Sequence, residues 1–349
     1  MGPDRDVRLV QLTHRDPHAD AAALIARFTP PGRFADVRFD TYAPNDEHPS
    51  QRAALDALRS FSAESAPASA SGPRRLFKRS SRSDAVAARP ARYLDGGFGV
   101  GKTHLLASLW HEGPHPKAFL TFAELTAVIG FLGMSKAVDA FGSFRLVCID
   151  EFELDDVANT LMAVTFLRSI IGDTKVAATS NTLPDKLGEG RFAAEDFRRE
   201  IAAIADHFEV LRIDGPDYRA KDRVEAEPMS DVELEQFVST HLDAGRAVSR
   251  DRFDALLPHL RAVHPVQVAG LLDGLDAVAI DQLAPISNQG DALLFVHLVD
   301  ELYDADIAVA ATGCRIEELF PASYRSGGYR KKYGRCESRL LSMLGDTSS

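Results

Sequence analysis

The sequence contains few cysteines, and they form no pattern. Only three occur, Cys148, Cys314 and Cys336, far apart and in no C-x-x-C pair. An odd number of scattered cysteines argues against a disulfide framework and against a zinc site, and so favours a reducing compartment. Cys148 lies within an apolar run, so we expect it to be a small buried core residue.

The sequence also lacks a long apolar segment and an excess of positive charge. No run approaches the roughly 18 apolar residues of a spanning helix, and the N-terminus has no apolar stretch of signal-peptide length. The formal net charge is −11. This argues against nucleic acid as a partner, because non-specific binding relies on neutralisation of phosphates by Lys and Arg. We therefore expect a cytosolic protein, or at most one that is peripheral to a membrane.

The chain is long enough for two domains. Between residues 92 and 213, apolar β-rich runs alternate with helical patterns, which predicts an α/β fold with a parallel sheet flanked by helices. Ser230 and Glu233 have the spacing of a capping box and predict a helix start after the core. We expect an N-terminal approach segment at 1–61, a linker at 62–83, a core at 84–222 and a smaller C-terminal domain at 223–349.

The linker at 62–83 is rich in Ser, Ala, Pro and Arg and has no hydrophobic period, which is typical of a flexible insertion. It carries a cluster of basic residues, namely Arg74, Arg75, Lys78, Arg79 and Arg82. This cluster is either a solvated loop or a contact for acidic partners or nucleic acid.

The strongest motif is GGFGVGKT, residues 96–103, which matches the P-loop pattern G-x-x-x-x-G-K-[ST]. Glycines let backbone N–H groups wrap a phosphate chain, Lys102 is a cation for the β- and γ-phosphates, and Thr103 offers a hydroxyl to Mg²⁺. A strand precedes the motif and a helix follows, with its positive end at the phosphates. We expect ATP contacts from Gly96, Gly97, Phe98, Gly99, Val100, Gly101, Lys102, Thr103 and His104.

Two adjacent carboxylates end the apolar strand LVCIDEF. We expect Asp150 to belong to the Mg²⁺ shell and Glu151 to orient or deprotonate the attacking water. A second buried strand ends in Thr179, Ser180 and Asn181. If this strand lies between the other two, Asn181 can hydrogen-bond the water or the γ-phosphate, with Thr179 as the alternate candidate.

The chain resembles the ZapE-type, AFG-like ATPases of the AAA+ class. The resemblance is carried by CIDEFELDDVANTLMAVTFLRSI, VAATSNTLPDKL and HFEVLRIDGPDYR, by residues 33–55, and by DELYDADIAVAATGCRIEELF and SRLLSML near the C-terminus. It implies a P-loop NTPase core with a C-terminal lid, in which Asn181 is sensor 1. Arg198 and Arg199 follow the family's finger position, where Asp196 replaces its arginine, and Arg339 is a candidate lid arginine. Leu293 and Leu294 replace the family's paired lid arginines.

The resemblance further implies an ATPase that acts on other proteins. We also expect a homo-oligomer with ATP, because the arginines that complete such sites often come from a neighbouring subunit. Bacterial members modulate the division-ring polymer FtsZ at the inner membrane. Two other functions remain open: a helicase-loader-like ATPase of DNA transactions, which also carries GKTHLL, and a scaffold that binds ATP but hydrolyses it slowly. The excess of acidic residues favours a protein client over DNA. Peripheral association with the inner face of the membrane is compatible with this expectation.

Overall fold

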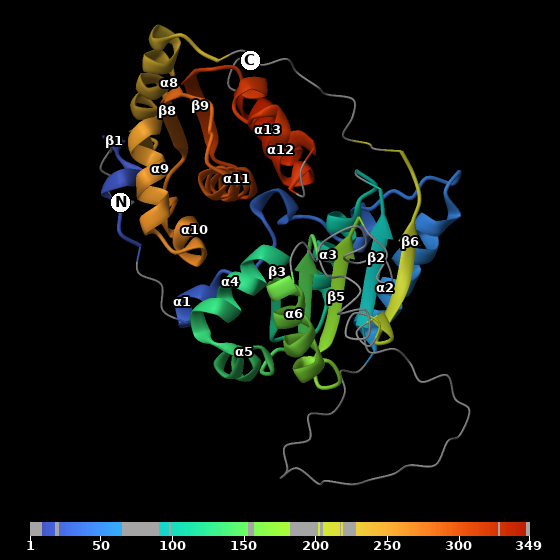
Figure 1. Cartoon of the computed structure of the whole chain (residues 1–349). Coiled ribbons are helices and arrows are strands. Elements are labelled where there is room, and N and C mark those ends of the chain that lie inside the picture. Colours follow the sequence, from blue (N-terminus) through green and yellow to red (C-terminus); the bar gives the residue numbers. More distant parts are fainter. Residues whose placement is uncertain are drawn as a thin grey trace, which may run out of the picture. The chain divides into compact units, whose positions relative to one another are not determined.

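The computed structural model describes residues 9–17, 21–64, 91–97, 99–152, 157–181, 202, 205–216, 218, 228–326 and 329–346. The chain divides into two compact units (Figure 1). The core unit consists of Ile25–Pro30 and Asp36–Arg219, and the C-terminal unit of Met1–Leu24, Pro31–Ala35 and Ala220–Ser349. Residues 1–61, treated above as one approach segment, therefore divide between the two units.

The core unit is built on a five-stranded parallel sheet with the order β3-β4-β5-β2-β6. Its strands are β2 (Ala91–Gly96), β3 (Lys117–Thr121), β4 (Leu146–Asp150), β5 (Lys175–Ser180) and β6 (Phe208–Ile213). The α/β fold with a parallel sheet is thus confirmed. Strand β5, which leads to Asn181, lies between the strand that precedes the P-loop and the strand that ends in Asp150, as the site requires.

The helices of the core unit are α2 (Pro49–Ala63), α3 (Lys102–Glu112), α4 (Phe122–Leu132), α5 (Met134–Phe141) and α6 (Val157–Ile170). The short helix α1 (Ala21–Ala26) precedes them. Helix α3 packs against the central strands, next to α2. The sequence analysis did not predict α5. Cys148 is fully buried in β4, as expected.

The C-terminal unit contains a second parallel sheet, with the order β1-β7-β8-β9. Its strands are β1 (Leu9–Val10), β7 (Val248–Arg252), β8 (Ala277–Leu283) and β9 (Ala308–Gly313). Strand β1 comes from the N-terminal segment, about 240 residues before its partner β7. The buried carboxylate of Asp251 holds this segment, because it accepts hydrogen bonds from the backbone N–H groups of Leu12 and Thr13 at 2.9 and 3.0 Å.

Helices cover both faces of this sheet. They are α8 (Asp231–Asp243), α9 (Phe253–Ala262), α10 (Val268–Leu271), α11 (Gln289–Asp304), α12 (Ala322–Ser326) and α13 (Arg330–Asp346). Because side chains alternate along a strand, Val278 and Ile280 enter the main core with α9 and α11, whereas Ala277 and Ala279 pack with α8. Ser230 caps α8, with Glu233 completing the predicted capping box.

Some of the residues considered above lie outside the described ranges, namely most of the linker at 62–83 and Phe98 of the P-loop. The same holds for most of residues 194–207, whose sequence pattern predicts a helix. Among the residues that are described, no helix is long and apolar enough to cross a membrane.

Candidate nucleotide-binding site

The P-loop follows β2 and leads into α3. Gly99 and Gly101 have φ angles of 69° and 90°, a left-handed region that glycine adopts at no steric cost. A Cβ atom on Gly96 would lie 2.4 Å from the carbonyl oxygen of Ile213 on β6. The glycines at these positions are therefore required by the backbone itself, and they shape a loop whose N–H groups can approach phosphate oxygens closely.

The first turn of α3 fits an anion. Gly101 is the N-cap residue and has no side chain that could accept a hydrogen bond from the first N–H groups of the helix. Unpaired N–H groups and the positive end of the helix dipole together make a site for a phosphate. The backbone at the start of α3 therefore suits the triphosphate that the P-loop motif predicts.

Lys102 lies at the centre of the site. Its ammonium group donates hydrogen bonds to the carbonyl oxygens of Gly96 and Gly97 at 2.9 and 2.5 Å, and to the side-chain oxygen of Asn181 at 2.8 Å. These bonds employ three donors, the number that an ammonium has. The structure thus brings together Lys102 and Asn181, 79 residues apart, whereas the role of Asn181 as a sensor stays a prediction.

The end of β4 brings a carboxylate to the beginning of α3. The hydroxyl of Thr103 lies 3.1 and 3.2 Å from the two carboxylate oxygens of Asp150. Asp150 is 7% exposed. Hydroxyl and carboxylate oxygens are the hard ligands that Mg²⁺ prefers in proteins, so this pair fits the metal expected with ATP.

The next residue, Glu151, leaves the strand. Its φ angle is +54°, which is uncommon for a residue with a side chain and is often found at functional sites. Its backbone N–H donates to the hydroxyl of Thr179 at 3.0 Å. The turn that begins at Glu151 is therefore held by the neighbouring strand β5.

The approach segment covers the loop, which the sequence did not reveal. The hydroxyl of Tyr42 donates to the carbonyl oxygen of Val100 at 3.1 Å, and a Cβ atom on Gly101 would lie 2.6 Å from the Tyr42 ring. Burial, together with the smaller electrostatic effect of Tyr218, raises the pKa of Tyr42 to about 12. The phenol is therefore neutral and remains a donor at physiological pH.

His104, expected to contact the nucleotide, packs edge-on to the Tyr42 ring at 5.5 Å between centroids. Its Nε2 lies 2.9 Å from the hydroxyl of Thr41. Burial lowers the pKa of His104, and a hydrogen bond with the Arg38 backbone opposes this in part. The ring is therefore neutral at pH 7.

The start of α2 is tied to the end of β6. The buried side chain of Gln51 accepts from the backbone N–H of Asn45 at 2.9 Å and donates to the carbonyl oxygen of Asp214 at 2.8 Å. The sequence pattern of residues 50–61 predicts a helix with Ser50 as its N-cap, but this prediction was wrong. The helix begins at Pro49 after His48, since proline has a fixed φ that suits the first turn, and the Ser50 hydroxyl accepts from the Asp214 N–H instead.

Asp95, the residue before Gly96, is a further group that the motif did not predict. It is 8% exposed, and burial raises its pKa, while the nearby Arg212 and Lys102 oppose this rise. Its carboxylate adds negative charge near Lys102 and so helps to compensate the partly buried ammonium.

A comparison with family models identifies the family to which this chain belongs. The model described as AFG1-like ATPase matches residues 19–347 of this chain. The chain belongs to the AFG1-like ATPase family. Since the match spans nearly the whole chain, it includes both compact units.

The relatives of this AFG1-like ATPase are distant. The cell division protein ZapE of Escherichia coli K12 is 23% identical over 296 residues, which cover 72% of this chain and 77% of ZapE. Among solved structures, DnaI is 18% identical with a TM-score of 0.39, covering 54% of this chain and 93% of that one. AMPPCP-bound DnaA from Aquifex aeolicus is 11% identical with a TM-score of 0.39, covering 89% and 91%.

The arginine candidates remain predictions. Arg198 and Arg199 lie outside the described residues. Arg339 in the C-terminal unit donates to Asp300 at 2.6 Å, and its guanidinium lies 4.8 Å from the centroid of the Tyr303 ring. The two aspartates Asp300 and Asp304 both pair with Arg339, which supports a structural role for it in this unit.

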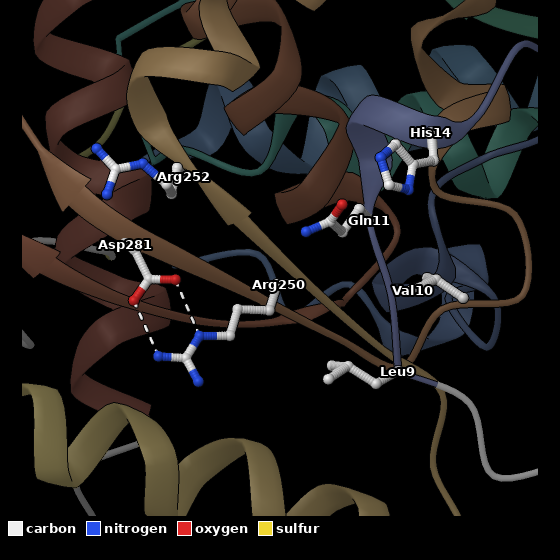
Figure 2. Close-up of a pocket in the computed structure, with 7 residues that line it drawn as sticks. All are labelled: Leu9, Val10, Gln11, His14, Arg250, Arg252 and Asp281. Carbon is white, nitrogen blue, oxygen red and sulfur yellow. Dashed lines mark hydrogen bonds and ion pairs between the residues drawn. The ribbon is translucent and has the colours of Figure 1, made fainter.

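A pocket of about 420 Å³ lies in the C-terminal unit of this AFG1-like ATPase, at the carboxyl ends of β1, β7 and β8 (Figure 2). Its cationic side chains are paired within the protein. Arg250 forms two hydrogen bonds with Asp281, at 2.9 and 3.1 Å, and Arg252 forms two with Asp254, at 3.1 and 2.7 Å. With its charges compensated in this way, the pocket offers no clear preference for an anion.

Proposed function

We propose that this AFG1-like ATPase hydrolyses Mg²⁺–ATP and uses the reaction to remodel a protein client. One observation carries the proposal: Lys102, Asp150 and Asn181 come from three separate segments and converge at the carboxyl edge of one parallel sheet. Ligands of α/β proteins bind at this edge. A P-loop lysine, a metal-binding carboxylate and a polar sensor together suit phosphoryl transfer to water.

The chain's own residues divide the task. The N–H groups of the P-loop and of the first turn of α3 bind the phosphates. Lys102 exchanges at least one of its hydrogen bonds with Gly96, Gly97 or Asn181 for a phosphate oxygen, since its three donors are otherwise occupied. Exchange of the bond to Asn181 would make this side chain available to the attacking water or the γ-phosphate.

Thr103 and Asp150 would hold Mg²⁺, which neutralises negative charge on the β- and γ-phosphates when bound. Glu151 orients the attacking water or accepts its proton. Tyr42 and Gln51 keep the approach segment over the loop and so limit the access of other water molecules.

Glu151→Gln tests the hydrolysis. The substitution keeps the size of the side chain but removes the base, so we expect ATP binding at wild-type affinity and a loss of phosphate release of about 100-fold or more. Exposed Glu47→Gln is the matched control and keeps its activity. Equally slow phosphate release by the wild type and Glu151→Gln would favour the ATP-binding scaffold instead.

For the client, we propose the division-ring polymer FtsZ at the inner face of the membrane. Support comes from the distant relative, which is named as a cell division protein. ATPase activity is measured with and without FtsZ polymer, alongside sedimentation of the polymer. Stimulation and a shift of polymer to the supernatant are expected. Stimulation by DNA without an effect of FtsZ would favour the helicase-loader-like function.

We further propose that ATP promotes a homo-oligomer in which Arg198 or Arg199 completes the site of a neighbour. Turnover per chain is then expected to rise with protein concentration. Substitution of the responsible arginine by Ala would remove this rise, whereas a specific activity that is constant from nanomolar to micromolar protein contradicts the oligomer.

A further inference from the structure

The end of strand β5 contacts the acid pair through one hydroxyl group. The Thr179 hydroxyl donates to a carboxylate oxygen of Asp150 and accepts the backbone N–H of Glu151 at 3.0 Å. The carbonyl oxygen of Thr179 accepts the N–H of Phe152 at 2.7 Å. Thr179 thus bonds to three consecutive residues, two of which we have placed in the catalytic machinery.

The sheet register explains why Thr179 is in this place. The β4–β5 ladder pairs Ile149 with Ala178, so the following residues, Asp150 and Thr179, lie side by side on adjacent strands. Thr179 is 2% exposed, and its side chain therefore does not exchange its partners for water. A β-branched side chain in a strand also has restricted rotamers.

A hydroxyl suits both contacts at once. Its single hydrogen goes to the carboxylate of Asp150, and an oxygen lone pair accepts the N–H of Glu151. The first bond restricts the carboxylate that faces the Thr103 hydroxyl. The second stabilises the left-handed backbone of Glu151, which is unfavourable for a residue with a Cβ atom.

We propose that Thr179 is a positioning residue that sets the orientation of both acids, Asp150 toward the metal and Glu151 toward the water. This role rests on the proposed function of the site as a Mg²⁺–ATP hydrolase. Thr179 itself is not required to touch the nucleotide, and its effect on the reaction is transmitted through the two acids.

Thr179→Val tests the role, because valine has nearly the same shape but no hydroxyl. We expect kcat to fall about 10- to 100-fold, as for the loss of a hydrogen bond to a charged group, with ATP affinity nearly unchanged. The Mg²⁺ concentration for half-maximal activity should rise. Thr179→Ser keeps the hydroxyl and restores kcat to within about threefold of the wild type.

Thr174→Val is the matched control. Thr174 is also buried and stands beside β5, but its hydroxyl donates to the carbonyl oxygen of Phe144 at 2.9 Å, away from the acids. This variant should lose thermal stability while it keeps kcat and the Mg²⁺ dependence. It therefore measures the effect of removing a buried hydroxyl on stability, without an effect on the two acids.

The outcomes are distinguishable. If Thr179→Val hydrolyses ATP as the wild type does, or if Thr179→Ser and Thr174→Val lose as much kcat as Thr179→Val, the positioning role is overturned while the hydrolase remains. If the wild type releases no more phosphate than Glu151→Gln, the proposed function fails and the role fails with it.

Discussion

The ammonium of Lys102 and the side-chain oxygen of Asn181 are 2.8 Å apart. This bond joins the P-loop to the residue that follows β5. The lysine expected to bind the nucleotide is therefore in direct contact with Asn181, the residue expected to act as the sensor. Because Lys102 has two further bonds to Gly96 and Gly97, its position does not depend on Asn181 alone.

Asn181→Ala should therefore separate binding from chemistry. Lys102 keeps its bonds to the loop carbonyls, so we expect ATP affinity to change little. The loss of the polar group at the reacting end should lower kcat about 10- to 100-fold. Binding of a fluorescent ATP analogue and single-turnover phosphate release measure the two effects.

Lys102→Ala, in contrast, should lose ATP binding. An equal loss of ATP affinity in Lys102→Ala and Asn181→Ala would show that Asn181 contributes to binding and not to hydrolysis alone.

Gly101→Ala should damage the loop. The new Cβ atom would lie 2.6 Å from the Tyr42 ring at a φ of +90°, a conformation that costs roughly 1–2 kcal/mol for other residues. We expect ATP affinity to fall by about tenfold or more. Gly130→Ala is the control, since its Cβ meets nothing within 4 Å, and helix α4 should tolerate or favour it. Isothermal titration with ATP compares them, and wild-type affinity in Gly101→Ala would show that the loop adapts.

The half-buried imidazole of His104 should make the free energy of unfolding depend on pH. Burial lowers its pKa below the ordinary value of 6.5, so on acidification through this pH the unfolded chain takes up a proton that the native state does not. The free energy of unfolding should then decrease below about pH 6.5 and be insensitive to this group above it. Urea unfolding from pH 5 to 7.5 should show a steeper decrease for the wild type than for His104→Gln. Parallel curves would contradict the assignment.

Asp251→Asn should loosen the N-terminal strand. The carboxylate accepts from two backbone N–H groups and from the Thr13 hydroxyl, whereas an amide has only one oxygen and would turn its own donors toward N–H groups. We expect a loss of about 2–4 kcal/mol in the C-terminal unit. Hydrogen exchange at Leu12 and Thr13 should accelerate, while exposed Asp243→Asn leaves it unchanged. Unchanged exchange in Asp251→Asn would mean that β1 holds the segment without this carboxylate.

The local chemistry of the site could be predicted because it depends on short patterns. The P-loop motif predicted which glycines, lysine and threonine would bind the phosphates, and Ser230 with Glu233 predicted the start of α8. Helix α5, strand β1 and strand β7 were missed. They are short, and β7 contains Arg250, Asp251 and Arg252, whose charges conceal the apolar run that usually indicates a buried strand.

By itself, the sequence determined the class of the core and the candidate nucleotide ligands, because backbone conformation in a P-loop depends on glycine at fixed spacings. Only the tertiary structure decided that Tyr42 covers the loop, that Thr179 contacts both acids, and that the N-terminal segment adds a strand to the C-terminal sheet. The physical reason is that these contacts join positions from about 30 to 240 residues apart. Strand order and register decide which distant groups become neighbours. Neither can be derived from a local pattern of residues.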